Sequence, residues 1–341
     1  AIGRAGAGVN NIPVAECSKR GIPVFNSPGA NANAVKELVA TGLLLGSRGV
    51  VDGIQYVDTL AAMQDEVELN KTLEAHKKEF KGSELVGKTL GVVGLGAIGS
   101  LVAEMALTLG MEVIGYDPAL SVEAAWRLSS QVRKADALST LFARSDYVSL
   151  HLPVLDSTRG LINSELLNAA KPGCCLLNFA RQEIVDEESL LQALDSGKLR
   201  KYIADFPSPR LIGRNDVILM PHIGASTDEA EENCAIMAAD QLRDFLENGN
   251  IRNSVNFPTL QLERVTGCRL SVTNENVPRI LGSVLAILAD EDINVIDMLN
   301  KSRDEIAYNL IDIGTHVSED VLGKMRALEG VVNVRLIGDC A

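Results

Sequence analysis

The sequence predicts an α/β protein with a doubly wound parallel sheet, followed by a C-terminal βαββαβ unit. Apolar, β-branched runs alternate with helix-length segments between residues 88 and 225. Parallel strands that are covered on both faces read as nearly continuous apolar runs, so this alternation indicates a parallel sheet. Residues 269–341 change character, with strands expected at 269–275, 293–302, 305–314 and 331–337 and helices at 279–291 and 318–328.

Composition narrows the class of ligand. The 341 residues are 46% hydrophobic and carry a formal charge of -13, without a basic cluster that could serve a nucleic-acid or anionic-membrane partner. No apolar run approaches the roughly 20 residues that span a bilayer. The opening "AIGRAGAGVNN" has no signal-like character, and the six cysteines lack C-x-x-C spacing. We therefore expect reduced thiols, a cytoplasmic location, no metal site and a small-molecule ligand.

The segments that flank the sheet are expected to be helical. "NANAVKELVATGLLLGSRGVV" has a helical period with small residues along it, which fits either a dimer contact or an ordinary buried helix. Residues 58–82 are charged and predict one exposed helix that ends at Gly82. A further helix begins at Ser226 or Thr227, has carboxylates in its first turn and stops before Gly249. Residues 250–267 resemble a linker.

The segment "GVVGLGAIGS" carries a dinucleotide-binding pattern. Gly94, Gly96 and Gly99 follow a predicted strand and open a helix, and Asp117 closes the next strand 18 residues after Gly99. This is the context of the Rossmann fingerprint, in which the glycines allow a tight turn, approach of the pyrophosphate and close helix packing. Asp117 would accept from the ribose hydroxyls and repel a 2′-phosphate, so NAD is the predicted cofactor.

Two polar side chains lie just beyond strand ends, where such sheets bind ligands. His222 follows the apolar run "DVILMP", and Arg181 follows "GCCLLNFA". An imidazole can take a proton from a hydroxyl group, and a guanidinium can hold a carboxylate. The alternatives are a structural histidine at a strand end and a surface ion pair.

Several separated motifs together resemble the D-isomer-specific 2-hydroxyacid dehydrogenases. They are "GKTLGVVGLGAIGSLVAEMALTLGMEVIGYDP", "HLPVLDSTRGLIN", "LLNFARQEIVD" and "PHIGASTDEAEENCA". The resemblance implies that His222 is the acid/base and Arg181 the carboxylate clamp. It also implies a substrate-carboxylate loop at Gly6, Ala7 and Gly8. It further implies cofactor contacts at Gly94, Gly96, Ala97, Ile98, Gly99, Asp117, Phe179, Ala180, Arg181, Asp205, His222, Ile223 and Gly224.

This chain departs from the family pattern at the catalytic pair. The family's histidine is normally paired with a glutamate shortly after the strand that ends here at Asp205, but "DFPSPRLIG" offers only Ser208, Pro209 and Arg210. The imidazole should therefore be held more loosely. Gln182 and Glu183 stand where the family usually has a glycine after the arginine, and Glu183 is a candidate substitute for the missing acid.

The C-terminal segment "RLSVTNENVPRILGSVLAILADEDINVIDM" resembles an ACT domain, which implies an amino-acid effector site or a structural, dimerising role. Asn276 and Asn294 match effector-contact positions, whereas Asn274 replaces a histidine. Arg279 replaces a glycine that lets a ligand approach the backbone.

The resemblance divides the chain into three parts. We expect a partial, flavodoxin-like substrate domain (1–30 with 226–257), a Rossmann domain (31–225) and an ACT-like domain (268–341). Family members have about fifty further residues before the first strand, estimated from domain lengths.

Three functions stay open, with a homodimer or homotetramer expected. The chain could oxidise a phosphorylated D-2-hydroxy acid, oxidise another 2-hydroxy acid, or serve as an NAD-binding sensor or scaffold with weak catalysis.

Overall fold

The computed structural model describes residues 1–265 and 268–338. The chain forms two compact units, one from residues 32–227 and the other from residues 1–31 together with 228–341. The finer division of the second unit into a partial substrate domain and an ACT-like domain stays a prediction.

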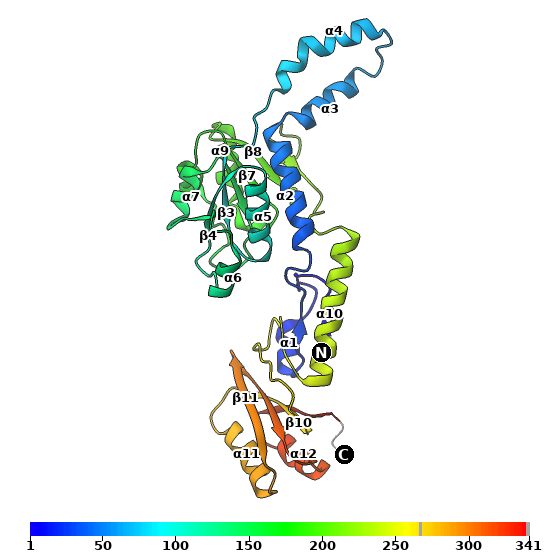
Figure 1. Cartoon of the computed structure of the whole chain (residues 1–341), viewed down its shortest axis with the longest axis vertical. Helices are drawn as coiled ribbons and strands as arrows, with labels where there is room; N and C mark the ends of the chain where they lie inside the picture. Colours follow the sequence, from blue (N-terminus) through cyan, green and yellow to red (C-terminus); the bar gives the residue numbers. More distant parts are fainter. Residues whose placement is uncertain (266–267, 339–341) are drawn as a thin grey trace. The chain divides into compact units, whose positions relative to one another are not determined.

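A seven-stranded parallel sheet, in the order β5-β4-β3-β6-β7-β8-β9, forms the centre of the unit of residues 32–227 (Figure 1). Each predicted apolar run forms one of its strands. The prediction lacks β5, because its two residues are exposed and charged and therefore carry no apolar signal. The strands are β3 (Thr89–Val93), β4 (Glu112–Tyr116), β5 (Arg133–Lys134), β6 (Tyr147–Leu150), β7 (Cys174–Asn178), β8 (Leu199–Ala204) and β9 (Val217–Leu219).

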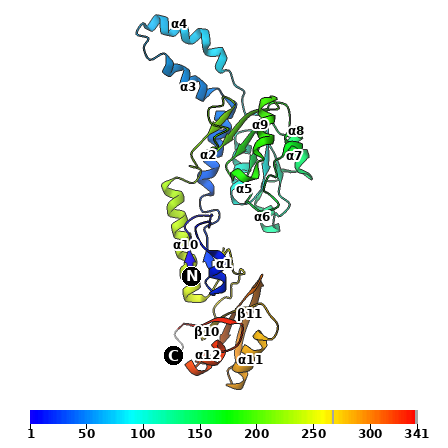
Figure 2. The same ribbon diagram turned by 180° about the vertical axis from the view of Figure 1, so that it is seen from behind.

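Helices cover both faces of this sheet, as the doubly wound prediction requires. Successive strand residues alternate between the two cores: Val92 and Leu177 face one, and Val93 and Leu176 face the other. Helices α2 (Ala32–Ser47) and α5 (Ala97–Thr108) pack on the first face. On the second face lie α7 (Leu138–Arg144), α8 (Ser164–Ala169) and α9 (Glu187–Asp195), grouped on one side of the sheet in Figure 2. The short segments α6 (Val122–Arg127) and η2 (Gln182–Ile184) complete this part.

Two small residues of α2 face the sheet. A Cβ at Gly42 would lie 2.9 Å from Cζ of Phe179, and one at Gly46 would lie 2.9 Å from Cδ1 of Ile203. These glycines therefore let the helix approach β7 and β8 closely. These contacts fit the interpretation as an ordinary buried helix, and a dimer contact of α2 stays a prediction.

The prediction of a single helix at 58–82 is wrong. The chain instead forms α3 (Val50–Thr59), α4 (Glu66–His76) and the 3-10 turn η1 (Lys77–Phe80), which extend away from the sheet as an arm. Asp65 caps α4 by accepting from the N–H groups of Val67 and Glu68, so the charged stretch contains a helix start. Neither α3 nor α4 has a buried residue.

The other unit begins with two short parallel strands, β1 (Ile2–Gly3) and β2 (Val24–Phe25), joined through α1 (Val14–Lys19). Its long helix α10 (Asp228–Asn248) starts directly after Thr227 and has the expected carboxylates in its first turn. Gly249 ends it with a φ of 74°, a left-handed conformation that glycine adopts without a steric penalty.

The C-terminal residues form the predicted βαββαβ unit, with an antiparallel sheet in the order β11-β12-β10-β13. One face packs against the two helices, and the other packs against Phe25, Phe245 and Phe257. Residues 250–265 are therefore not a simple linker, since Leu260 and Leu262 are buried in this second core. The elements are β10 (Cys268–Glu275), α11 (Ile280–Asp290), β11 (Val295–Arg303), β12 (Ile306–Ile313), α12 (Glu319–Arg326) and β13 (Val331–Ile337).

The cysteines follow the prediction in part. Cys17, Cys174, Cys175 and Cys234 are free and buried. Cys268 is disulfide-bonded, which corrects the expectation for that residue, and the sixth cysteine, Cys340, lies outside the described residues. A disulfide does not require C-x-x-C spacing, so the local pattern does not reveal it. Within the described residues, no helix is long and apolar enough to cross a membrane, and no cluster of three or more His, Cys, Asp or Glu residues could hold a metal ion.

Candidate active site

The predicted residues of the Rossmann unit lie along one edge of the parallel sheet. Asp117 follows β4, the Gly94–Gly99 turn follows β3, Arg181 follows β7, Asp205 follows β8 and His222 follows β9. Because these strands are parallel, their carboxyl ends meet at the same edge. The strand order therefore places the glycine turn, Arg181 and His222 along one edge of the sheet, after β3, β7 and β9, with one strand between each of these and the next.

Each glycine of the turn has a separate structural reason. Gly94 has a φ of 89°, and a side chain there would overlap the carbonyl oxygen of His151. A Cβ at Gly99 would overlap the carbonyl oxygen of Gly94, so the first turn of α5 packs directly on the loop. Gly96 has open space where a Cβ would be, and it precedes α5 without a side-chain cap. This is an open cradle beside uncapped helix N–H groups, which fits a pyrophosphate. Ala97 and Ile98 form the start of α5.

Asp117 is oriented by backbone donors at the end of β4. Its Oδ2 accepts from the N–H of Leu95 (2.8 Å) and its Oδ1 from that of Ala119 (2.9 Å). Each carboxylate oxygen can accept more than one hydrogen bond, so both retain capacity for a ribose hydroxyl. The carboxylate is thereby fixed beside the glycine turn, as NAD recognition requires.

Asn178, which the sequence analysis does not single out, organises the loop that carries Arg181. Its Nδ2 donates to the carbonyl of Arg181 (2.8 Å) and to the hydroxyl of Tyr202 (3.2 Å), and its Oδ1 accepts from the N–H of Ala180 (3.1 Å). Burial raises the pKa of the Tyr202 phenol, which therefore remains neutral. The guanidinium of Arg181 donates to the carbonyl of Ala180 (2.7 Å) and is only partly buried.

The ring of Phe179 packs against α2 at Gly42. The absence of a side chain at Gly42 therefore determines where the loop of residues 179–181 lies. We expect overpacking in Gly42→Ala to lower the free energy of unfolding of this unit by about 1–3 kcal/mol. The higher helix propensity of alanine should offset about 1 kcal/mol of that loss. The displaced Phe179 should also shift Arg181 and raise KM for the substrate. Gly53→Ala is the matched control, since its Cβ would meet nothing closer than 3.7 Å and should stabilise α3. Urea unfolding and steady-state kinetics of both variants measure this, and equal behaviour of the two would refute it.

Asp205 has a clear structural role at the His222 loop. The side chain is 1% exposed, and its two oxygens accept from the N–H groups of Ile223 (2.8 Å) and Gly224 (2.7 Å). His222 itself adopts a left-handed φ of 59°, which is uncommon for a residue with a side chain. Its exposed ring lies against Phe206, with 4.9 Å between the ring centroids. The buried carboxylate thus anchors the strained turn that presents the imidazole.

Among the described residues, no carboxylate makes a hydrogen bond or ion pair with the His222 ring. Arg210 pairs with Glu188 (2.9 Å) and Glu187 (3.8 Å) of α9. Ser208 has a buried hydroxyl that finds no hydrogen-bond partner in the part of the chain that the structure describes. Glu183 is exposed on η2, and its carbonyl accepts from the N–H of Gly160. The departure noted in the sequence therefore persists in the structure.

The predicted substrate loop belongs to the other unit. The carbonyl of Gly6 accepts from the N–H of Ser27 (3.0 Å), and that of Ala7 accepts from Nδ2 of Asn26 (2.8 Å). Gly6 has a φ of 139°, which favours glycine at this position. The loop is thus tied to the segment that follows β2.

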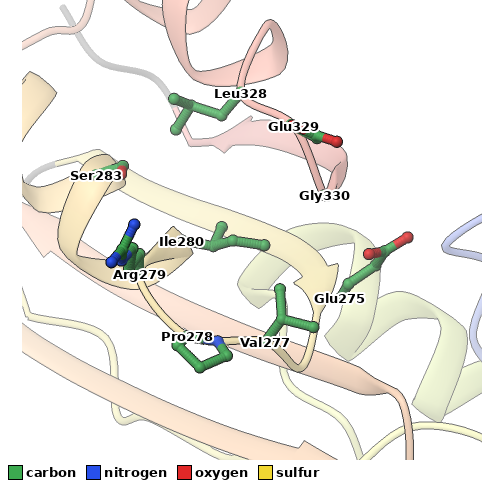
Figure 3. A pocket seen from close by; sticks show the side chains of 9 residues that line it. All are labelled: Glu275, Val277, Pro278, Arg279, Ile280, Ser283, Leu328, Glu329 and Gly330. Atoms are coloured by element: carbon green, nitrogen blue, oxygen red, sulfur yellow. The ribbon is translucent and has the colours of Figure 1, made fainter.

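The two predicted effector residues do not meet within one chain. Asn276 donates to the carbonyl of Asp304 at the β11–β12 turn (3.2 Å), whereas Asn294 precedes the opposite end of β11. Arg279 has a φ of 81° and lines a cavity of about 380 Å³ with Glu275, Ser283 and Glu329 (Figure 3). Arg279 is thus part of the wall of this cavity.

The strand order, the glycine cradle and the oriented aspartate define an NAD-binding dehydrogenase domain. The family model "D-isomer specific 2-hydroxyacid dehydrogenase, NAD binding domain" matches residues 54–224. D-3-phosphoglycerate dehydrogenase of Haemophilus influenzae is 34% identical over 99% of this chain and 81% of its own length. The enzyme of the same name from Escherichia coli K12 is also 34% identical, with the same coverage.

A solved structure of a protein with the same named activity is also similar to this chain. The NAD⁺-bound 3-phosphoglycerate dehydrogenase of Entamoeba histolytica is 32% identical, covers 75% of each chain and gives a TM-score of 0.58. The chain belongs to the D-isomer specific 2-hydroxyacid dehydrogenase family.

Proposed function

We propose that the protein oxidises 3-phosphoglycerate to 3-phosphohydroxypyruvate with NAD, the first reaction of serine synthesis. The observation that carries this proposal is the placement of His222 and Arg181 beyond β9 and β7, on the sheet edge that also holds the glycine cradle. The named substrate of the relatives supports the choice of 2-hydroxy acid.

The residues have distinct tasks in this reaction. Bound NAD supplies the acceptor for the hydride that leaves C2 of the substrate. His222 takes the hydroxyl proton at one of its ring nitrogens. Arg181 pairs with the substrate carboxylate and polarises the forming carbonyl. The free N–H groups of the Gly6–Gly8 loop are donors of the kind that bind a carboxylate. Asp205 holds the backbone on which His222 is presented.

A substrate panel tests the proposal. NADH absorbance is followed with purified protein, NAD and, in turn, 3-phosphoglycerate, glycerate and lactate. We expect the largest kcat/KM with 3-phosphoglycerate. A larger value with glycerate or lactate would assign the chain to another 2-hydroxy acid.

A second function, an NAD-binding sensor or scaffold, is favoured by one observation. Within the described residues, the His222 ring has no carboxylate partner, and such partners normally fix the tautomer of a catalytic histidine. This alternative predicts tight NADH binding without turnover of any substrate in the panel.

Restoring a carboxylate separates the two functions further. We expect Pro209→Glu to raise kcat by roughly tenfold or more, because a partner would fix and charge-stabilise the imidazole. Ile212→Glu is the control, since Ile212 is 65% exposed in the same loop and offers no such pairing. The rate of NADH formation gives kcat for both variants. An unchanged kcat in Pro209→Glu would show that the missing acid does not limit turnover.

We also propose that the protein forms a homodimer or homotetramer and that its C-terminal module binds an amino-acid effector. A homodimer or homotetramer is supported by the arm, where Ile54 and Val57 of α3 are more than half exposed. An amino-acid effector bound through Asn276 and Asn294 would need two copies of the C-terminal module, because β11 separates these residues in one chain. A cytoplasmic location is favoured by the four free thiols and opposed by the disulfide of Cys268.

A further inference from the structure

The loop predicted to bind the substrate carboxylate is seated on α10 through side chains that no motif reveals. Three of its carbonyls point at the segment after β2. Ser27 donates its N–H to the carbonyl of Gly6 (3.0 Å) and its hydroxyl to that of Arg4 (3.1 Å). Asn26 donates to the carbonyl of Ala7 (2.8 Å). These contacts fix the loop from one side.

The opposite side of the loop is left with free donors. Every described peptide bond is trans, and in a trans peptide the N–H points away from the carbonyl of the preceding residue. The engaged carbonyls of Arg4, Gly6 and Ala7 therefore direct the N–H groups of Ala5, Ala7 and Gly8 outward. Within the described part of the chain, none of these N–H groups donates a hydrogen bond. Free backbone N–H groups of this kind can donate to a carboxylate.

Helix α10 binds the segment of Asn26 and Ser27, which in turn binds the loop of residues 4–8. The single hydrogen of the Ser27 hydroxyl is shared between the carbonyl of Arg4 and that of Cys234 (3.0 Å). Nε2 of Gln241 donates to the carbonyl of Asn26 (3.1 Å). Ser27 is 0% and Gln241 6% exposed. Gln241 also donates to Met237 (2.9 Å), so both of its N–H groups are engaged. The loop, the β2 segment and α10 are thus linked by buried hydrogen bonds.

We propose that Ser27 and Gln241 are positioning residues that aim the N–H groups of Ala5, Ala7 and Gly8 at the substrate carboxylate. Neither touches the substrate, and both act through the backbone of residues 4–7. This inference rests on the proposed function. It predicts that their loss weakens the binding of the hydroxy acid and spares both NAD binding and the chemical step.

Gln241→Met and Ser27→Ala test the proposal, with Tyr308→Phe as the control. Tyr308 also donates a buried hydrogen bond to a carbonyl, that of Gly249 at the far end of α10 (2.8 Å), and so matches the stability loss without touching the loop. In each of the two test variants we expect KM for 3-phosphoglycerate to rise roughly tenfold, with kcat and KM for NAD nearly unchanged. Tyr308→Phe should keep the wild-type KM. An unchanged KM in both test variants, or an equal rise in Tyr308→Phe, would overturn the inference.

Amide hydrogen exchange gives a readout that does not depend on turnover. Exchange at residues 4–8 should be faster in Gln241→Met and Ser27→Ala than in wild type and Tyr308→Phe. If the wild type turns over no 2-hydroxy acid, the proposed function fails. Faster exchange in the two test variants would still support the role of Ser27 and Gln241 in holding the loop, called here the loop seat. Unchanged exchange in both test variants refutes the loop seat whatever the activity.

Discussion

Replacing Arg269 by methionine is expected to destabilise the unit of residues 1–31 and 228–341 by about 3–5 kcal/mol. Arg269 is 0% exposed, and it pairs with Asp312 through Nε (2.5 Å) and Nη2 (2.8 Å). Its remaining N–H groups donate to the carbonyls of Asn248, Leu262 and Glu263. The arginine thus joins the end of α10 to the C-terminal sheet, and its loss would leave the carboxylate of Asp312 buried without a counter-charge.

Urea unfolding of the variant measures this effect, and two controls interpret it. Arg20→Met removes an exposed pair with Glu16 and should change stability little. The double variant Arg269→Met with Asp312→Leu should recover most of the loss, because it removes both charges together. A single variant as stable as Arg20→Met would show that the buried pair contributes nothing.

Replacing His222 by alanine is expected to lower kcat by a factor of about 10²–10⁴, the usual contribution of a positioned general base. Binding of NADH should persist, because the cradle lies on β3 and β4 rather than on β9. Trp126 on α6 is the only tryptophan, so quenching of its fluorescence by NADH gives an independent measure of binding.

His76→Ala is the control for this experiment, since His76 lies on the arm and pairs with Glu79. It should keep the wild-type kcat. A His222→Ala variant that turns over normally would remove the imidazole from the mechanism, and one that no longer binds NADH would show a wider structural defect.

The fold was largely predictable because its signals are local. The apolar runs of the parallel sheet and the alternation of the βαββαβ unit each occupy a few consecutive residues. The structure places the elements of the βαββαβ unit within one or two residues of the predicted bounds. The arm was harder to predict. Its charged residues suit an exposed helix, but Asp65 starts a second helix by capping, which a charge pattern does not show.

The candidate site was predictable only where a motif carries it. The glycine turn, Asp117, Arg181 and His222 all follow predicted strands, so their common edge can be anticipated. The anchoring of the His222 loop by Asp205, the loop fold around Asn178 and the loop seat formed by Ser27 and Gln241 depend on contacts between distant segments. Spacing in the sequence does not encode such contacts.

The central claim is that Arg181 and His222 act on one substrate molecule. A double-mutant cycle on kcat/KM for 3-phosphoglycerate, with Arg181→Met, His222→Ala and the combined variant, tests it most directly. Residues that act as a unit are strongly non-additive, so the combined variant should be scarcely slower than His222→Ala alone. Losses that multiply independently would contradict the claim.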